Sequence, residues 1–163
     1  PRDLPPASAL GMPTALAIID DVLNGKLAAA NAREQMVAIV AAGPQGVLEL
    51  QLDAQLSTRR GWPTTALLRS VYAQRSDLVS LVLDMRADPD VGDAKGVSAL
   101  HTAAFDGLNQ IIESLLLADA NVDARDIHGQ TPLFFAADRG VCEHLVGARA
   151  GINLVNNSGQ SAL

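Results

Sequence analysis

Three histidines and one cysteine are the side chains of this 163-residue chain that are best suited to catalysis or metal binding. Cys142 and His144 are two residues apart, and residues two apart on a helix do not share a face, so they are not placed as a nucleophile and its base. His101 and His128 lack a second cluster of histidine, cysteine or carboxylate ligands at the spacing of a zinc site. The sequence therefore predicts neither a catalytic residue nor a metal site.

Phosphate-binding loops and catalytic carboxylate pairs are not indicated either. The Gly-Pro-Gln-Gly segment at 43–46 has neither the lysine nor the preceding strand that a P-loop needs. Acidic residues such as Asp20, Asp21, Asp123 and Asp126 occur at expected helix starts or turns, where capping of backbone N–H groups explains them. We expect a protein that is not an enzyme and that binds no cofactor.

The composition narrows the class of partner. A net charge of −6 and a pI near 4.8 argue against a broad contact with a phosphate backbone, which needs clustered Lys and Arg. No apolar run approaches the roughly 18 residues of a membrane span. A single cysteine fits a reducing compartment. We expect a cytoplasmic monomer that binds another protein, and neither nucleic acid nor a membrane.

A short sequence motif recurs along the chain and indicates the helices that must position any binding residue. The order hydroxyl, small or cyclic residue, leucine occurs at Thr65–Leu67, at Ser98–Leu100 and at Thr131–Leu133. The two intervals between these copies are equal, so the pattern has a constant 33-residue step. An alanine pair and a glycine follow at matching positions in the second and third copies. A fixed period of about 20 to 50 residues is typical of a stacked repeat array.

These residues resemble the ankyrin repeat, whose pattern is a hydroxyl-Pro-Leu-His run, two alanines, a glycine, a second apolar helix and a closing Asn or Asp. The match is closest over 93–123, good over 126–140 and degenerate over 60–90. Ala99 stands in place of the proline, and Phe134 stands in place of the histidine. The resemblance implies an all-α ankyrin-repeat solenoid of stacked helix–turn–helix units with short projecting turns.

The predicted organisation has three parts. Residues 1–13 are expected to form a linker or disordered lead, and 14–57 a helical N-terminal cap that includes a degenerate repeat. The repeat array then occupies 58–163, with units at about 58–90, 91–123 and 124–153 and a partial unit over 154–163. Helices are predicted at 15–23, 31–40, 47–52, 65–74, 77–86, 98–106, 109–118, 131–139 and 141–148.

The third full repeat is shorter than the second. The interval from Ala136 to Asn153 is shorter by three than the corresponding interval from Ala103 to Asp123. We therefore expect three residues to be missing from the second helix of this repeat or from the loop after it. The small residues of 147–151 stand where a leucine-rich helix end should be, so the stack is expected to be weaker or differently angled there.

Function should reside in the positions that the repeat pattern leaves free. In the ankyrin family these are the two finger-tip positions, the residue after the tip glycine, and the two positions between the alanine pair and the next glycine, whereas the position of His101 is structural. The chain's only Trp and only Tyr fall in this set, and Trp, Tyr and Arg dominate binding energy at protein interfaces. The alternative for Trp62 is packing against Pro63 over the junction between the cap and the first full repeat. The predicted partner-binding residues are Trp62, Tyr72, Lys95, Phe105, Asp106, Ile127, His128, Asp138 and Arg139.

Three functions remain open. The first is a non-catalytic protein–protein recognition module that binds its partner on a concave surface of finger tips and inner helices. The second is the substrate-recruiting or targeting ankyrin region of a larger enzyme. Because the alanine-rich, degenerate repeats resemble those of bacterial ankyrin proteins, this second hypothesis includes a bacterial effector that acts on host proteins in the host cytoplasm. The third is an internal spacer or an oligomerisation surface.

Overall fold

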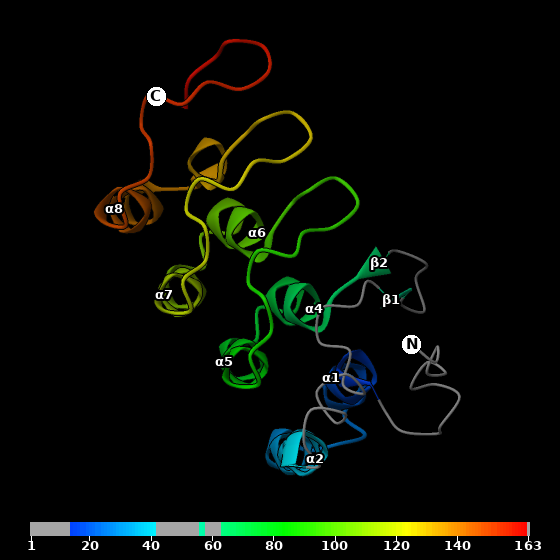
Figure 1. The fold of residues 1–163 in the computed structure, drawn as a ribbon. Coiled ribbons are helices and arrows are strands. Elements are labelled where there is room, and N and C mark those ends of the chain that lie inside the picture. Colours follow the sequence, from blue (N-terminus) through cyan, green and yellow to red (C-terminus); the bar gives the residue numbers. More distant parts are fainter. Residues whose placement is uncertain (1–13, 42–55, 58–62, 163) are drawn as a thin grey trace.

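The computed structural model describes residues 14–41, 56–57 and 63–162, which form an elongated stack of helix pairs (Figure 1). The predictions for the lead at 1–13, the helix at 47–52 and Trp62 lie outside the described residues. The bounds of the cap and of the individual repeats stay predictions.

Helices account for nearly all of the regular structure in the described residues, which confirms the predicted all-α solenoid. The exception is a short antiparallel pair, β1 (Leu56–Ser57) with β2 (Pro63–Thr64). The helices are α1 (Ala15–Leu23), α2 (Ala29–Ala41), α4 (Ala66–Tyr72), α5 (Ser76–Asp84), α6 (Ala99–Phe105), α7 (Asn109–Leu117), the 3-10 helix η2 (Pro132–Phe135) and α8 (Arg139–Gly147).

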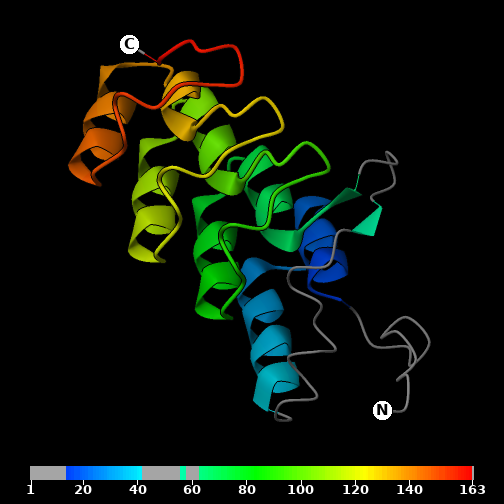
Figure 2. The ribbon, with the colours of Figure 1, turned by 45° about the horizontal axis from the view of Figure 1, so that its top comes forward.

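The helices lie in two rows. The inner row contains α1, α4, α6 and η2, and the outer row contains α2, α5, α7 and α8 (Figure 1). Long turns project from the inner row, on the side opposite to the outer row (Figure 2). The molecule therefore has two long faces. We call the surface formed by the projecting turns and the inner helices the concave face. We call the outer surface of the outer row the convex face.

Alanine and leucine side chains fill the space between the helices. Ala103 and Ala104 on α6 are completely buried, and their small size lets α6 pack closely against α4 and η2. Leu100 on the same helix is 1% exposed, and Ile112 and Leu115 on α7 are completely buried. These residues belong to one continuous apolar core that runs from α1 to α8, so each helix pair is covered by its neighbours.

Threonine side chains cap the N-termini of α1 and α4, near the helix starts that the sequence predicts. The Thr14 hydroxyl accepts a hydrogen bond from the Ala17 N–H at 3.2 Å, and the Thr65 hydroxyl accepts one from the Leu68 N–H at 3.1 Å. Because first-turn N–H groups have no partner within the helix, these bonds fix the helix starts. Within the described residues, helix ends agree with the predicted ones to within two residues, except in the inner helix of the third repeat.

The third repeat loses its three residues from the inner helix, so the prediction that they are missing from the second helix or the following loop is wrong. The residues that precede the inner helices, Ser98 and Thr131, still keep the 33-residue step. The outer helices α7 and α8 are both nine residues long, but Arg139 begins α8 three residues before the position that the same step from Asn109 would give. The predicted helix over 131–139 is therefore only the four-residue η2.

The start of α8 explains why the inner helix stops early. The Asp138 side chain caps α8 by accepting a hydrogen bond from the Val141 N–H at 2.9 Å, which leaves no room for a second inner turn after Thr131. Ala136 leaves the helical conformation at φ −56° and ψ 111°. The Ala137 N–H then donates to the Ala104 carbonyl at 3.1 Å. An extended segment thus contacts α6 in place of the missing turn.

Two leucines on α7 provide a direct test of this core. Leu115 is completely buried and Leu117 is 87% exposed. We expect Leu115→Ala to lower the free energy of unfolding by about 2 to 5 kcal/mol, because it leaves a cavity. Leu117→Ala should change it by less than about 0.5 kcal/mol. Urea unfolding followed by circular dichroism measures both values, and equal losses would contradict the placement of α7.

Candidate functional site

Three projecting turns, which we call fingers, have the same internal hydrogen bonds. In the finger at 93–97, one Asp93 carboxylate oxygen accepts from the N–H groups of Lys95 and Val97, at 2.8 and 3.0 Å. Asp126 does the same in the finger at 126–130, and the Asn156 amide oxygen does so in the finger at 156–160. These side chains stabilise the turns, as the sequence indicated for Asp126.

Backbone hydrogen bonds also join each finger to the next. The Ile127 N–H donates to the Lys95 carbonyl at 2.9 Å, and the Asn157 N–H donates to the His128 carbonyl at 2.9 Å. Gly129 has a φ of +73°, and a Cβ at this position would clash with the Asn157 side chain. Glycine is therefore required for both the turn and the close approach. The fingers form one connected edge of the concave face.

His101 links the second repeat to the finger that follows it. Its ring is completely buried, Nδ1 accepts from the Ser98 N–H at 3.2 Å, and Nε2 lies 3.0 Å from the Gln130 carbonyl oxygen, to which it donates. The ring also meets Phe135 edge-on, with centroids 5.5 Å apart. Burial lowers the pKa of His101, which keeps the imidazole neutral. The side chain has the structural role that the resemblance implied.

A hollow of about 390 Å³ lies on the concave face between the fingers and the inner helices. Four predicted binding residues line it, namely Tyr72, Lys95, Phe105 and Asp106. Val97, which follows the tip glycine and is another position that the repeat pattern leaves free, also lines it, together with Asp93, His101, Thr102 and Phe135. We call this feature the concave hollow.

The concave hollow combines exposed rings with a charged rim. Phe105 is 67% exposed and Tyr72 is 49% exposed, which is unusual for side chains of this size. Partial burial raises the pKa of Tyr72, the nearby carboxylates of Asp93 and Asp106 raise it further, and the Thr102 hydroxyl partly opposes these effects. Tyr72 therefore stays protonated at neutral pH and can donate a hydrogen bond to a partner.

Two predicted binding residues lie elsewhere, contrary to the repeat register assumed for them. Asp138 caps α8, and Arg139 is the first residue of that outer helix, where its side chain pairs with Glu143 at 2.6 Å. The shortened inner helix is the reason, because it moves both positions out of the inner row. Ile127 and His128 remain on a finger tip and are exposed, but they do not line the concave hollow.

Phe135 is a large lining residue that the sequence pattern did not assign to binding. The constant step of the repeat aligns it with Thr102, which lies between His101 and the alanine pair and is not among the positions assigned to binding. Its ring reaches the concave hollow from η2, beside His101. Among the described residues no group of three His, Cys, Asp or Glu side chains is placed to hold a metal ion. Within the same ranges no helix is long and apolar enough to cross a membrane.

Comparison with known proteins identifies the fold. A family model described as ankyrin repeats in three copies matches residues 27–126, and a single ankyrin repeat model matches residues 128–157. The chain belongs to the ankyrin repeat family. Ankyrin repeat arrays are generally non-enzymatic interaction modules, and the match supports a protein–protein interaction module in this chain.

The chain is also similar to short stretches of much longer curated proteins. It is 36% identical over 110 residues to Neurogenic locus notch homolog protein 1 of Xenopus laevis, a match that covers 65% of this chain and 4% of the relative. It is 34% identical over 93 residues to the RelA-associated inhibitor of Mus musculus, covering 55% of this chain and 11% of the relative. Both relatives are vertebrate proteins, so they give no support to a bacterial effector.

Acidification should destabilise this ankyrin repeat array through His101. Because burial lowers its pKa in the folded state, the unfolded chain binds the proton more readily. The contribution of His101 to the free energy of unfolding is therefore complete above the pKa of histidine in the unfolded chain, about 6.5. It is lost as the pH falls below that value, by up to about 1.4 kcal/mol per pH unit. Urea unfolding at neutral and mildly acidic pH measures this slope.

Two histidine variants separate this effect from other titrating groups. His101→Gln should be less stable at neutral pH but should show a shallower loss on acidification, because it removes the buried imidazole. His128 is exposed on its finger, so His128→Gln should keep the slope of the wild type. An unchanged slope in His101→Gln would contradict the role given to this ring.

Proposed function

We propose that this ankyrin repeat array binds a partner protein on its concave face and that the concave hollow receives the main anchoring side chain of that partner. The carrying observation is that Tyr72, Lys95, Phe105 and Asp106 line one hollow, although they come from two helices and a finger. The repeat register already places these four positions on one face. What supports a shared task is their residue types, two exposed rings with a lysine and an aspartate.

The exposed rings supply the driving force in this proposal. The apolar surface of Tyr72 and Phe105 faces water in the free protein, and its burial contributes about 25 cal/mol per Å². Lys95 and Asp106 at the rim offer one charge of each sign, which favours a partner with complementary charges. An apolar or aromatic side chain with polar neighbours fits this arrangement.

The connected fingers support tight binding because they are already ordered. Ile127 and Lys95 share a backbone hydrogen bond, and Asp93 and Asp126 close their own turns. A surface that is rigid before binding loses less conformational entropy when the partner docks. We infer a partner footprint on the order of 800 Å² on this chain, which extends from the concave hollow to Ile127 and His128 on the finger tip.

The cellular setting is also part of the proposal. A net charge of −6 favours a protein partner over nucleic acid, and we propose a monomer in the cytoplasm that contacts no membrane. The chain spans 4% and 11% of the length of the two relatives described above. A role as the recruiting region of a larger protein is therefore the second candidate, and it uses the same concave face.

Removal of the two exposed rings should abolish partner binding without unfolding the array. We expect Tyr72→Ala combined with Phe105→Ala to weaken binding at least about a hundredfold, as at other aromatic hot spots. An affinity pull-down from native lysate identifies the partner, and titration of the purified partner by calorimetry measures the loss. Circular dichroism verifies that helicity is unchanged.

A matched variant shows whether the loss is specific to the concave hollow. Val37 on α2 is 44% exposed and far along the stack from η2, so Val37→Ala removes apolar surface from a different site (Figure 1). Its partner affinity should equal that of the wild type within about twofold. If the Tyr72 and Phe105 double variant retains full affinity, the concave hollow is not the binding site.

A further inference from the structure

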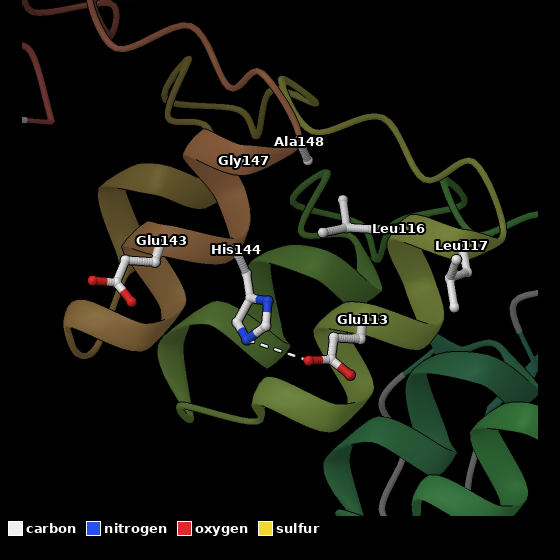
Figure 3. Close-up of a pocket in the computed structure, with 7 residues that line it drawn as sticks. All are labelled: Glu113, Leu116, Leu117, Glu143, His144, Gly147 and Ala148. Atoms are coloured by element: carbon white, nitrogen blue, oxygen red, sulfur yellow. Dashed lines mark ion pairs between the residues drawn. The ribbon is translucent and has the colours of Figure 1, made fainter.

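A second concavity lies on the convex face, away from the fingers. It is a groove of about 510 Å³ between the outer helices α7 and α8 (Figure 3). Its lining residues are Glu113, Leu116, Leu117, Glu143, His144, Gly147 and Ala148. We call this feature the convex groove. It shares no residue with the concave hollow.

The groove exists because α8 ends in small residues where α7 ends in leucine. The cap residues Ala118 and Ala148 occupy the same place on the two helices, so Gly147 corresponds to Leu117. A Cβ built on Gly147 would meet nothing within 4 Å. Nothing on α8 therefore covers Leu117, which is 87% exposed. Leu116 beside it completes an apolar floor.

The walls of the groove carry an excess of negative charge. Glu113 and Glu143 stand at equivalent positions of α7 and α8, and their side chains are 58% and 63% exposed. Both helices also end at the groove, where the helix dipole contributes partial negative charge. The last turn of α7 contains no basic residue, and that of α8 contains only His144.

No lysine or arginine is among the residues that line the groove. Arg139 pairs with Glu143 at 2.6 Å, and His144 Nε2 lies 3.5 Å from Glu113, which is too long for a strong hydrogen bond (Figure 3). Arg149 follows the α8 cap and is exposed. Of the two lining carboxylates only Glu143 is paired with an arginine, so Glu113 remains available to a positively charged side chain of a partner. A second copy of this chain is disfavoured as the occupant, because its net charge is −6.

We propose that the convex groove docks a basic amphipathic helix of a partner protein. Two neighbouring helices form a channel into which the side-chain ridge of a third helix can pack. Leucine or isoleucine side chains of the partner would cover Leu116 and Leu117, and lysine or arginine side chains would meet Glu113 and the helix ends. Such a helix lays one apolar face into a groove and keeps its charges at the rim. The two faces of the array can then hold two partners at once.

A synthetic probe tests this surface on the intact chain. The probe is a fluorescently labelled peptide of about 14 residues that carries leucine and lysine at helical spacing. We expect fluorescence anisotropy to show saturable binding to the wild type. A matched peptide with glutamate in place of lysine should bind at least about tenfold more weakly. Equal binding of the two peptides, or no binding of the first, would overturn the proposal.

Three variants locate the binding. Gly147→Leu places a side chain in the open space of the groove without a clash. Glu113→Lys reverses the charge of a residue that lines the groove. Each variant should weaken peptide binding about tenfold. Glu34→Lys makes the same charge change on an exposed position of α2, at the far end of the outer row, and should change affinity by less than about twofold. Equal losses in Glu34→Lys and Glu113→Lys, or no loss in Gly147→Leu, would show that the peptide does not use the convex groove.

The concave variant keeps this test separate from the proposed function. Tyr72→Ala should leave peptide affinity unchanged, because the concave hollow and the convex groove share no residue. A loss of peptide binding in Tyr72→Ala would place the peptide on the concave face and overturn the proposal. Circular dichroism of every variant verifies that the helices are intact.

Discussion

Burial between neighbouring helix pairs is the constraint on which the rest of this structure depends. No pair could hide Leu100, Ile112 or Leu115 alone, and each of these side chains is covered only because another pair packs against it. Ala103 and Ala104 permit the close approach that this packing needs. The apolar core therefore lies within the stack, and both long faces remain available for binding.

The shortened inner helix of the third repeat shows how the chain preserves this packing when residues are lost. The outer helix α8 keeps its full length and its cap at Asp138, while the inner helix is reduced to η2. The Ala137 N–H bonds to the Ala104 carbonyl, so the contact between repeats survives through the backbone. Phe135 on η2 then reaches the concave hollow beside His101. An irregularity of the repeat thus contributes to the candidate binding surface.

The regular part of the fold could be predicted from the sequence because it follows from local pattern. The hydroxyl caps, the alanine pairs and the constant repeat step place α4 to α7 to within two residues. The third repeat could not be predicted in the same way, because a count of residues shows that three are missing without showing which helix lost them. Asp138 fixes the start of α8 by capping it, and this early start shortens the inner helix. In the sequence, a capping aspartate cannot be told from any other surface aspartate.

The candidate site, too, was predictable where the repeats are regular and not beyond the irregularity. Tyr72, Lys95, Phe105 and Asp106 come from regular repeats, where a position in the pattern corresponds to a position on the concave face. Asp138 and Arg139 were assigned by the same rule beyond the irregularity, and there the rule fails. The convex groove depends on the absence of a side chain at Gly147, and only the packed structure shows what that absence exposes.

If the concave face holds the partner, Phe105 touches it. Photo-crosslinking tests this contact most directly, with a benzophenone side chain placed either at Phe105 or at Ser80, an exposed residue of the outer helix α5. The two proteins are irradiated with the partner that the wild-type chain captures. We expect a covalent adduct from position 105 and none from position 80. An adduct from position 80 with none from position 105 would contradict this expectation.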